Sequence, residues 1–471
     1  MSTNENKENL KISSSEEEKI NKVSFSPIPR FILYIVLLSV EMALNCGSGI
    51  LSSSSKQIKL ELNLNDKQFG MFGTAFGIGR GTGSFLFTII INKFNLKWLY
   101  IFYIFFKGFF MILFNFSNNG TILITLRGLI GVLHMGPTIY LPIWIDQYAF
   151  KKYKTTQLTM FQVIKPFGKV MGYTFNVLLG EKKWKYGFVI TGGYLWAVSL
   201  LIFCYPRNYF NANLKANKKE EDENRNTIYE YLPKVKKDEE KSYFQEMYEC
   251  LTSPIFQVAN WTRGIIDGFL TAVHYWCADY IRNALGVNDA KLIFLSYTTA
   301  CITGPVLGGF VGQIVNHLYG SYENPGAPYV CIGLQILVTI FGISATFMSN
   351  LYTFVGCLTL FLCFVSSVLS LCIGFLIVSV RPGLKSISNA ISNISMMFLL
   401  SGTSPMIYGS INDYFKPKGL NRMAMRFIMS ANIVGILLLL IFGKMRKNQL
   451  AQMKKENVEK LIKEGKELEE K

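Results

Sequence analysis

The chain has 471 residues, of which 50% are hydrophobic and 17% are charged. Soluble domains carry about 25% charged residues, so the composition excludes the soluble multidomain enzyme that the length alone would suggest. The 48 Lys and Arg residues outnumber the 31 Asp and Glu residues and leave a net charge of +17. The positions of these cations therefore bear directly on function.

The chain begins with a polar tail and continues as a series of apolar windows. Residues 1–30 are rich in Ser, Glu and Lys, so we expect a disordered cytosolic tail and no cleavable signal. A helix that crosses a bilayer needs about 20 apolar residues. Twelve such spans are predicted, at 31–51, 69–91, 98–116, 122–143, 158–179, 186–206, 255–280, 290–316, 328–348, 352–380, 387–410 and 424–443.

The spans form two sets of six. We predict one half at 31–206, a charged cytosolic linker at 207–253, a second half at 254–443 and a charged, helical cytosolic tail at 444–471. Lys and Arg gather in the tails, in the linker and in loops on the same side of the membrane, which places both termini in the cytosol. The predicted fold class is an all-α integral membrane protein of twelve helices in two halves, a layout typical of secondary transporters.

Patterns of soluble enzymes do not occur in this sequence. Gly-Ile-Gly-Arg-Gly-Thr-Gly at 77–83 looks like a dinucleotide-binding loop, but it lies inside an apolar span with no preceding strand. Close helix packing is the better interpretation. Walker loops, Ser-His-Asp order and zinc-ligand spacings are missing from the sequence. We therefore predict a monomer with no enzymatic activity, cofactor, metal site or nucleic-acid partner.

Charged side chains within the spans are functional candidates, because an ionisable group is costly at bilayer depth. Span 1 holds one acid, Glu41. The other spans of the first half hold five cations: Arg80, Lys107, Arg127, Lys165 and Lys169. Spans 8 to 11 are nearly free of charge. A basic first half and an apolar second half suit an amphiphile with an anionic head and an apolar tail.

Several short segments resemble the major facilitator superfamily. Thr-Ile-Ile-Ile-Asn-Lys-Phe-Asn-Leu-Lys at 88–97 resembles the loop between spans 2 and 3, with Asn92 in place of its Asp, Lys93 in place of its Arg, and Lys97 as the last cation. Leu-Arg-Gly-Leu-Ile-Gly at 126–131 resembles its Arg-Gly-x-x-Gly motif.

Further segments look like the spinster branch of that superfamily. They are 166–173, 324–331, 404–413 and the spacing from Arg127 to Asp146. The resemblance implies export of lysophospholipids or sphingoid phosphates, linked to protons, from lysosome-like compartments. It also implies a gating role for Asn92, Lys93, Lys97 and Asp146. The sequence departs from the branch where the family's acid falls on His134 and its span 1 Asp-Arg falls on Gly47 and Ser48.

In the superfamily, spans 1, 2, 4 and 5 line the cavity of the first half. We therefore predict that the substrate is bound by Arg80, Arg127, His134, Lys165 and Lys169, with Lys107 as a further candidate. The alternatives are that Arg127 pairs with Glu41, that Lys107 is satisfied by a backbone carbonyl or hydroxyl, and that His134 is a hydrogen-bonded core residue.

Three groups are candidates for proton coupling: Glu41, His134 and Asp267. Histidine ordinarily titrates near physiological pH. The alternative for Asp267 is a structural pair with Arg263, four residues earlier on the same helix face.

These features predict a secondary transporter of an anionic amphiphile, a lysophospholipid or related lipid phosphate, that works by alternating access. The expected partners are this substrate, membrane lipids and protons. Tyr229-Glu-Tyr-Leu232 fits a sorting signal and favours an endolysosomal or other internal membrane over the plasma membrane. The alternatives are a transporter of small organic anions or phosphorylated metabolites, and a non-transporting membrane scaffold or sensor.

Overall fold

Helices account for all the regular structure in the described part of the chain. The computed structural model describes residues 27–91, 93–148, 154–210, 243–319, 324, 326–380 and 384–469. Residues 1–26 of the predicted N-terminal tail, the sorting signal at 229–232 and most of the predicted linker lie outside these residues. Residues 27–30, predicted as disordered tail, instead begin the first described helix. No strand occurs within the described ranges, which agrees with the predicted all-α class.

The first half is a bundle of six long helices joined by short connections. Its long helices are α2 (Pro27–Ser53), α4 (Asp66–Ile90), α5 (Leu96–Leu113), α6 (Gly120–Tyr148), α7 (Lys154–Leu179) and α8 (Trp184–Cys204). The short elements are α3 (Ser55–Glu61), η1 (Phe114–Phe116), η3 (Glu181–Lys183) and η4 (Arg207–Tyr209). Helix α4 packs on α6, α2 on α7, and α5 on α8.

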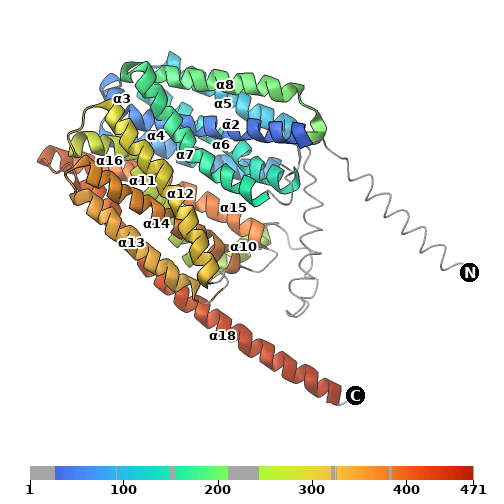
Figure 1. The fold of residues 1–471 in the computed structure, drawn as a ribbon. Coiled ribbons are helices and arrows are strands. Elements are labelled where there is room, and N and C mark those ends of the chain that lie inside the picture. The colour runs from blue at the N-terminus through green and yellow to red at the C-terminus, as the bar shows by residue number, and fades with distance from the viewer. Residues whose placement is uncertain are drawn as a thin grey trace, which may run out of the picture.

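The second half begins with α10 (Tyr243–Thr252), a short helix within the predicted linker that the sequence analysis did not anticipate. The rest of this half is α11 (Pro254–Ala284), α12 (Ala290–Tyr319), α13 (Ala327–Phe347), α14 (Leu351–Val378), α15 (Lys385–Ser395), η6 (Met396–Leu400), α16 (Ser404–Phe415), η7 (Lys416–Lys418), α17 (Met423–Ala431) and α18 (Ile433–Glu469). The two bundles lie side by side, and α4 packs on α16, α7 on α12, and α2 on α11 (Figure 1).

Nine helical segments in the described ranges are long and apolar enough to cross a membrane. Three of the predicted spans, now α4, α7 and α11, are not among them, although these helices have 25, 26 and 31 residues. All three carry charged residues within their predicted spans, and charge lowers their mean hydropathy. A count of twelve spans is consistent with this helix set.

The glycines at 77–83 allow α4 to approach helices on two sides. A Cβ added at Gly79 would lie 2.1 Å from the carbonyl oxygen of Gly128 in α6, and one at Gly83 would lie 2.1 Å from that of Val132. On the other side, a Cβ at Gly77 would lie 2.3 Å from Cα of Gly402 in the second half. The predicted role in close packing is therefore confirmed, because no larger residue fits these contacts.

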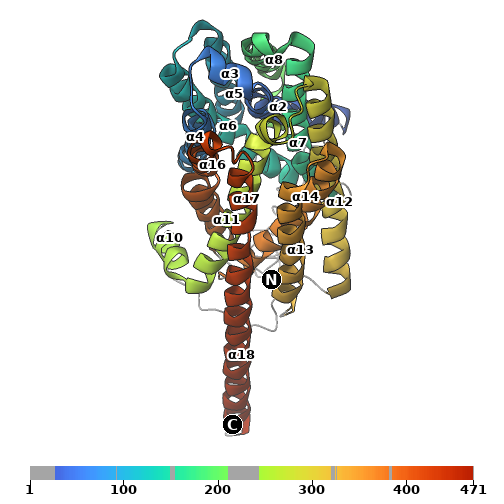
Figure 2. The same cartoon turned by 90° about the vertical axis from the view of Figure 1, so that its left-hand side faces the viewer.

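The last two predicted spans are interrupted. The span at 387–410 consists of α15, the π-helix η6 and α16, and π-helical turns often mark functional sites. The span at 424–443 breaks at Asn432, between α17 and α18. Helix α18 then continues through the charged tail as a single rod that projects from the bundle (Figure 2). Residues 444–469 of the predicted tail are thus helical, and the cytosolic location of the tail stays a prediction.

Candidate functional site

Lys107, Arg127 and His134 lie in the core of the first half. Their exposed fractions are only 0%, 2% and 2%. The Lys107 ammonium donates to the Leu44 carbonyl at 3.0 Å and lies 2.9 Å from Nδ1 of His134. This matches the alternative in which a backbone carbonyl satisfies Lys107, and it makes His134 a hydrogen-bonded core residue.

Arg127 is held by span 1, but not through Glu41. Its Nη2 donates to the Ser48 hydroxyl at 2.9 Å, and its guanidinium lies 4.0 Å from the centre of the Phe76 ring. The buried Glu41 carboxylate accepts from the Thr138 hydroxyl at 3.1 Å and from the Asn45 amide. An ion pair between Arg127 and Glu41 is not formed among the described residues.

The remaining cations, Arg80, Lys165 and Lys169, are only partly buried and face the second half. Each interacts electrostatically with Asp267 of α11, across the boundary between the halves. A side chain that faced lipid on the outside of the bundle could not do this. Lys165 and Lys169 also interact electrostatically with Arg80, so the structure brings these three predicted residues together. Lys107, Arg127 and His134 lie in the core of the first half, and each of them interacts electrostatically with Arg80.

Two of the charged side chains at the boundary between the halves, Lys169 and Asp267, lack a direct partner in the described part of the chain. Within the described ranges, neither Lys169 nor Asp267 makes a hydrogen bond or an ion pair through its side chain. Arg263 donates instead to Ser392 at 3.0 Å and to Asn393 at 2.9 Å, so the alternative of a close Arg263–Asp267 pair is not realised. Buried or half-buried charges are normally paired, so these groups have unused capacity for a charged ligand.

The π-helix η6 places apolar side chains next to these charges. It packs against both α4 and α11. A Cβ at Gly81, next to Arg80, would lie 2.7 Å from the Phe398 ring, and one at Gly264, next to Arg263, would lie 2.4 Å from Leu400. Sequence reasoning missed this element. The Ser-Gly-Thr-Ser-Pro run at 401–405 was the signal that this span is not a uniform helix.

Of the four predicted gating residues, the structure describes the side chains of two, Lys93 and Lys97. Asn92 falls outside the described residues, as does the side chain of Asp146. Lys93 is exposed. Lys97 is buried and donates to the carbonyls of Phe203 and Tyr205 at 2.8 and 2.7 Å, at the end of α8. It therefore caps a helix within its own half, and gating by this loop remains a prediction.

A polar cluster that the sequence analysis missed joins the halves at the end where α2 leads into α3. We call it the interhalf network and define it as Lys59, Asp66, Asp279, Asn412 and Asp413. Lys59 bridges Asp66 at 2.6 Å and Asp279 at 2.7 Å, and both carboxylates are only 4% exposed. Asn412 donates to Asp66 at 2.8 Å.

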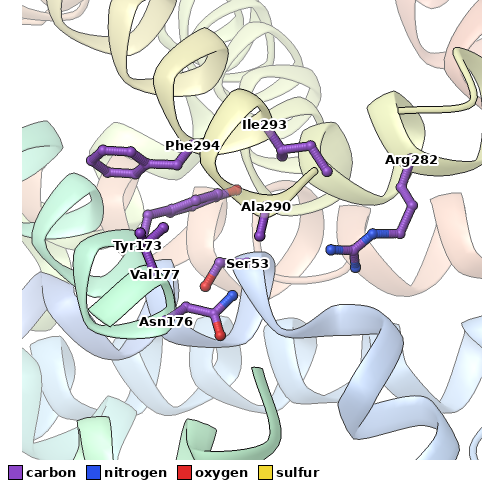
Figure 3. A pocket seen from close by; sticks show the side chains of 8 residues that line it. All are labelled: Ser53, Tyr173, Asn176, Val177, Arg282, Ala290, Ile293 and Phe294. Atoms are coloured by element: carbon purple, nitrogen blue, oxygen red, sulfur yellow. The ribbon is translucent and has the colours of Figure 1, made fainter. Parts of the chain in front are cut away.

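The same network also caps α4 from the opposite half. The Asp413 carboxylate accepts the backbone N–H groups of Asp66 and Lys67 at 2.9 and 2.8 Å. An acidic side chain is favourable there because the first N–H groups of a helix have no partner within it. Between α2, α7, α11 and α12, this end leaves a small cavity lined by Ser53, Tyr173, Asn176 and Arg282, with room for about one water molecule (Figure 3).

We expect the interhalf network to persist at the pH of an acidic organelle. Burial alone would raise the pKa of Asp66. The charges of Lys59 and Lys416 and the hydrogen bonds from Lys59 and Asn412 together outweigh burial and hold that pKa below its usual value. Burial alone would lower the pKa of Lys59, and its two aspartates raise it instead. The free energy that the Lys59–Asp66 ion pair contributes to folding is therefore lost only as pH falls below about 4 or rises above about 10.

This expectation can be measured through the Tm difference between the wild type and Lys59→Met. The difference should stay constant between about pH 5 and 8 and shrink only under stronger acid. A difference that disappears between about pH 5 and 6 would contradict the assignment.

Two apolar helix bundles whose charged side chains face each other across their boundary define a multi-pass membrane transporter. The sequence model of the Major Facilitator Superfamily matches residues 37–437. The chain therefore belongs to this superfamily, as predicted.

The resemblance to the spinster branch is also confirmed. A protein of Arabidopsis thaliana described as "probable sphingolipid transporter spinster homolog 1" is 23% identical over 388 residues, which cover 79% of this chain and 77% of that protein. A bacterial homologue of the human lysosomal transporter Spinster, solved in an inward-facing and unoccupied conformation, has a TM-score of 0.67. It is 14% identical, and the match covers 89% of this chain and 97% of that structure.

Other transporters share the fold. The D-xylose–proton symporter structure has a TM-score of 0.61 and 14% identity, over 87% of this chain and 97% of that structure.

Proposed function

We propose that this chain is a secondary transporter of an anionic amphiphile, a lysophospholipid or a related lipid phosphate. It works by alternating access in an endolysosomal or other internal membrane, with both termini in the cytosol. The observation that carries the proposal is the group of partly exposed cations, Arg80, Lys165 and Lys169, beside the apolar π-helix. Among the described residues, only two acids, Glu41 and Asp267, interact electrostatically with these three cations.

In this proposal the anionic head group binds among Arg80, Lys165 and Lys169. Binding offsets the positive charge by which these three side chains exceed the two nearby acids, Glu41 and Asp267. The apolar tail lies along η6 and the apolar faces of α11, α12 and α14. Arg127, Lys107 and His134 support the site from the core of the first half, because their hydrogen bonds are already made there.

The test is uptake of radiolabelled lysophosphatidylglycerol by vesicles that contain the purified protein. Each of Arg80→Ala and Lys169→Ala removes a charged contact of about 1.5–3 kcal/mol, so we expect KM to rise about 10- to 100-fold. The control is Lys291→Ala, which removes an exposed lysine at the start of α12 and should transport normally.

The other outcomes separate the alternatives. Normal KM values in both variants would overturn the head-group assignment. Competition by sugar phosphates or dicarboxylates, but not by lysolipids, would favour the small-anion alternative. If vesicles with the wild-type protein take up none of these solutes faster than empty vesicles do, the result would favour the non-transporting scaffold or sensor.

A further inference from the structure

His274 of α11 lies at the boundary between the halves and was not among the predicted coupling groups. Its side chain is half-buried. Nδ1 lies 3.3 Å from the hydroxyl of Tyr297 and 3.5 Å from the sulfur of Cys301, both on α12. From the first half, Lys169 interacts electrostatically with His274 and with Cys301. One turn beyond Lys169, the Tyr173 ring stacks on Tyr297, with centroids 4.3 Å apart.

The partners of His274 suit both of its protonation states. A tyrosine hydroxyl can donate to a neutral imidazole nitrogen and can accept from a protonated one, and a thiol can do the same more weakly. His134 differs, because its Nδ1 faces the ammonium of Lys107 at 2.9 Å. An ammonium has only donors, so a proton on that nitrogen would remove the hydrogen bond and place two cations in contact.

The chain has three histidines. The third, His317, lies near the end of α12, more than ten residues beyond Cys301 on the same helix. Histidine is the side chain whose unperturbed pKa lies near neutrality. His274 is therefore the histidine that combines a place between the halves, partners for both charge states and a neighbouring substrate-binding cation.

We propose that His274 takes up a proton when an anionic head group binds at Lys169, so that substrate and proton bind cooperatively. This inference rests on the proposed function and deepens it. Without substrate, the charge of Lys169 opposes a second positive charge on His274. A bound anion offsets that charge, and the proton then costs less. By linkage, the proton strengthens anion binding by the same factor. The other groups that face His274 are Tyr297 and Cys301 of α12, with Asp267 two turns earlier on α11.

The experiment is calorimetric binding of lysophosphatidylglycerol to the purified full chain in two buffers with different heats of ionisation. The difference between the heats counts the protons taken up. This lysolipid is a phosphodiester and does not titrate in the range used, whereas phosphate monoesters titrate near pH 6. Near neutral pH we expect the wild type to bind at most about one proton for each lysolipid that binds. Its affinity should rise about tenfold from pH 7.5 to 5.5.

His274→Gln should bind without proton uptake and without dependence on pH, and the matched control His317→Gln should behave as wild type. Tyr297→Phe keeps the stacked ring but removes the hydroxyl. Loss of a hydrogen-bond partner costs a charged group more than a neutral one, so the midpoint of proton uptake should shift to lower pH. This second variant tests the proposal even where His274→Gln is poorly folded.

Two results would count against these ideas in different ways. Proton uptake by His274→Gln equal to that of the wild type would overturn the role of His274 and leave the proposed function intact. A wild type that binds no lysophosphatidylglycerol at any pH would overturn the proposed function, and the inference would fail with it.

Discussion

Gly79→Ala is expected to prevent stable folding of the first half. The added Cβ would lie 2.1 Å from the Gly128 carbonyl oxygen and 3.0 Å from its carbon, and these are backbone atoms of α6 that cannot rotate away. Overpacking in protein cores costs about 1–3 kcal/mol and sometimes more. Because here two whole helices must separate, we expect at least about 3 kcal/mol. The measurement is the yield of monodisperse protein after detergent extraction, together with its Tm.

The matched control is Gly193→Ala in the middle of α8, where a Cβ would have no atom within 4 Å. Alanine is about 1 kcal/mol better than glycine inside a helix, so this variant should be as stable as the wild type or slightly more stable. Equal Tm values for Gly79→Ala and the wild type would show that the α4–α6 contact is not as close as described.

The difference between these glycines shows how far the sequence predicts the fold. Alternate glycines at 77–83 inside an apolar span predict close packing, because small residues are what allow helices to touch. They do not reveal which helix approaches which glycine. Gly79 and Gly83 face α6, fewer than 50 residues away, whereas Gly77 faces Gly402 in the other half.

The sequence likewise predicts only part of the candidate site. Charge inside an apolar span identifies Arg80, Lys165 and Lys169 as costly and therefore informative residues. It gives the same weight to Lys107, which in the fold is satisfied by a carbonyl of span 1. Only the three-dimensional arrangement separates a cation that faces the other half from one that has a partner in its own.

The interhalf network was beyond sequence reasoning for a related reason. Its members lie in predicted loops and helix ends, where charged residues are common and usually solvated. Lys59 and Asp279 are 220 residues apart, and Asp66 and Asp413 are 347 apart. A lysine in a short loop carries no sign that two acids from different halves will enclose it.

Lys59→Met should open the end of the molecule that the interhalf network holds together. Methionine keeps the length of the side chain but removes the charge, which leaves Asp66 and Asp279 buried without their shared cation. Removing one partner of a buried ion pair costs about 3–5 kcal/mol. Asp66 keeps its bond from Asn412, and Asp279 keeps one from Asn283 at 2.9 Å, so we expect the lower end of that range. About 3 kcal/mol corresponds to a change of about 100-fold in the equilibrium between closed and open forms.

Hydrogen–deuterium exchange measures this change without labels, in peptides that cover α3, the start of α4 and the end of α16. Lys59→Met should exchange faster in all three, since they lose protection together when the halves separate. The matched control is Lys416→Met. Its side chain is 43% exposed and lies 3.5 Å from Asp66, and an exposed pair contributes at most about 1 kcal/mol. Faster exchange in α3 alone would mean that Lys59 stabilises only its own loop, and equal exchange in Lys59→Met and Lys416→Met would mean that the network does not hold the halves together.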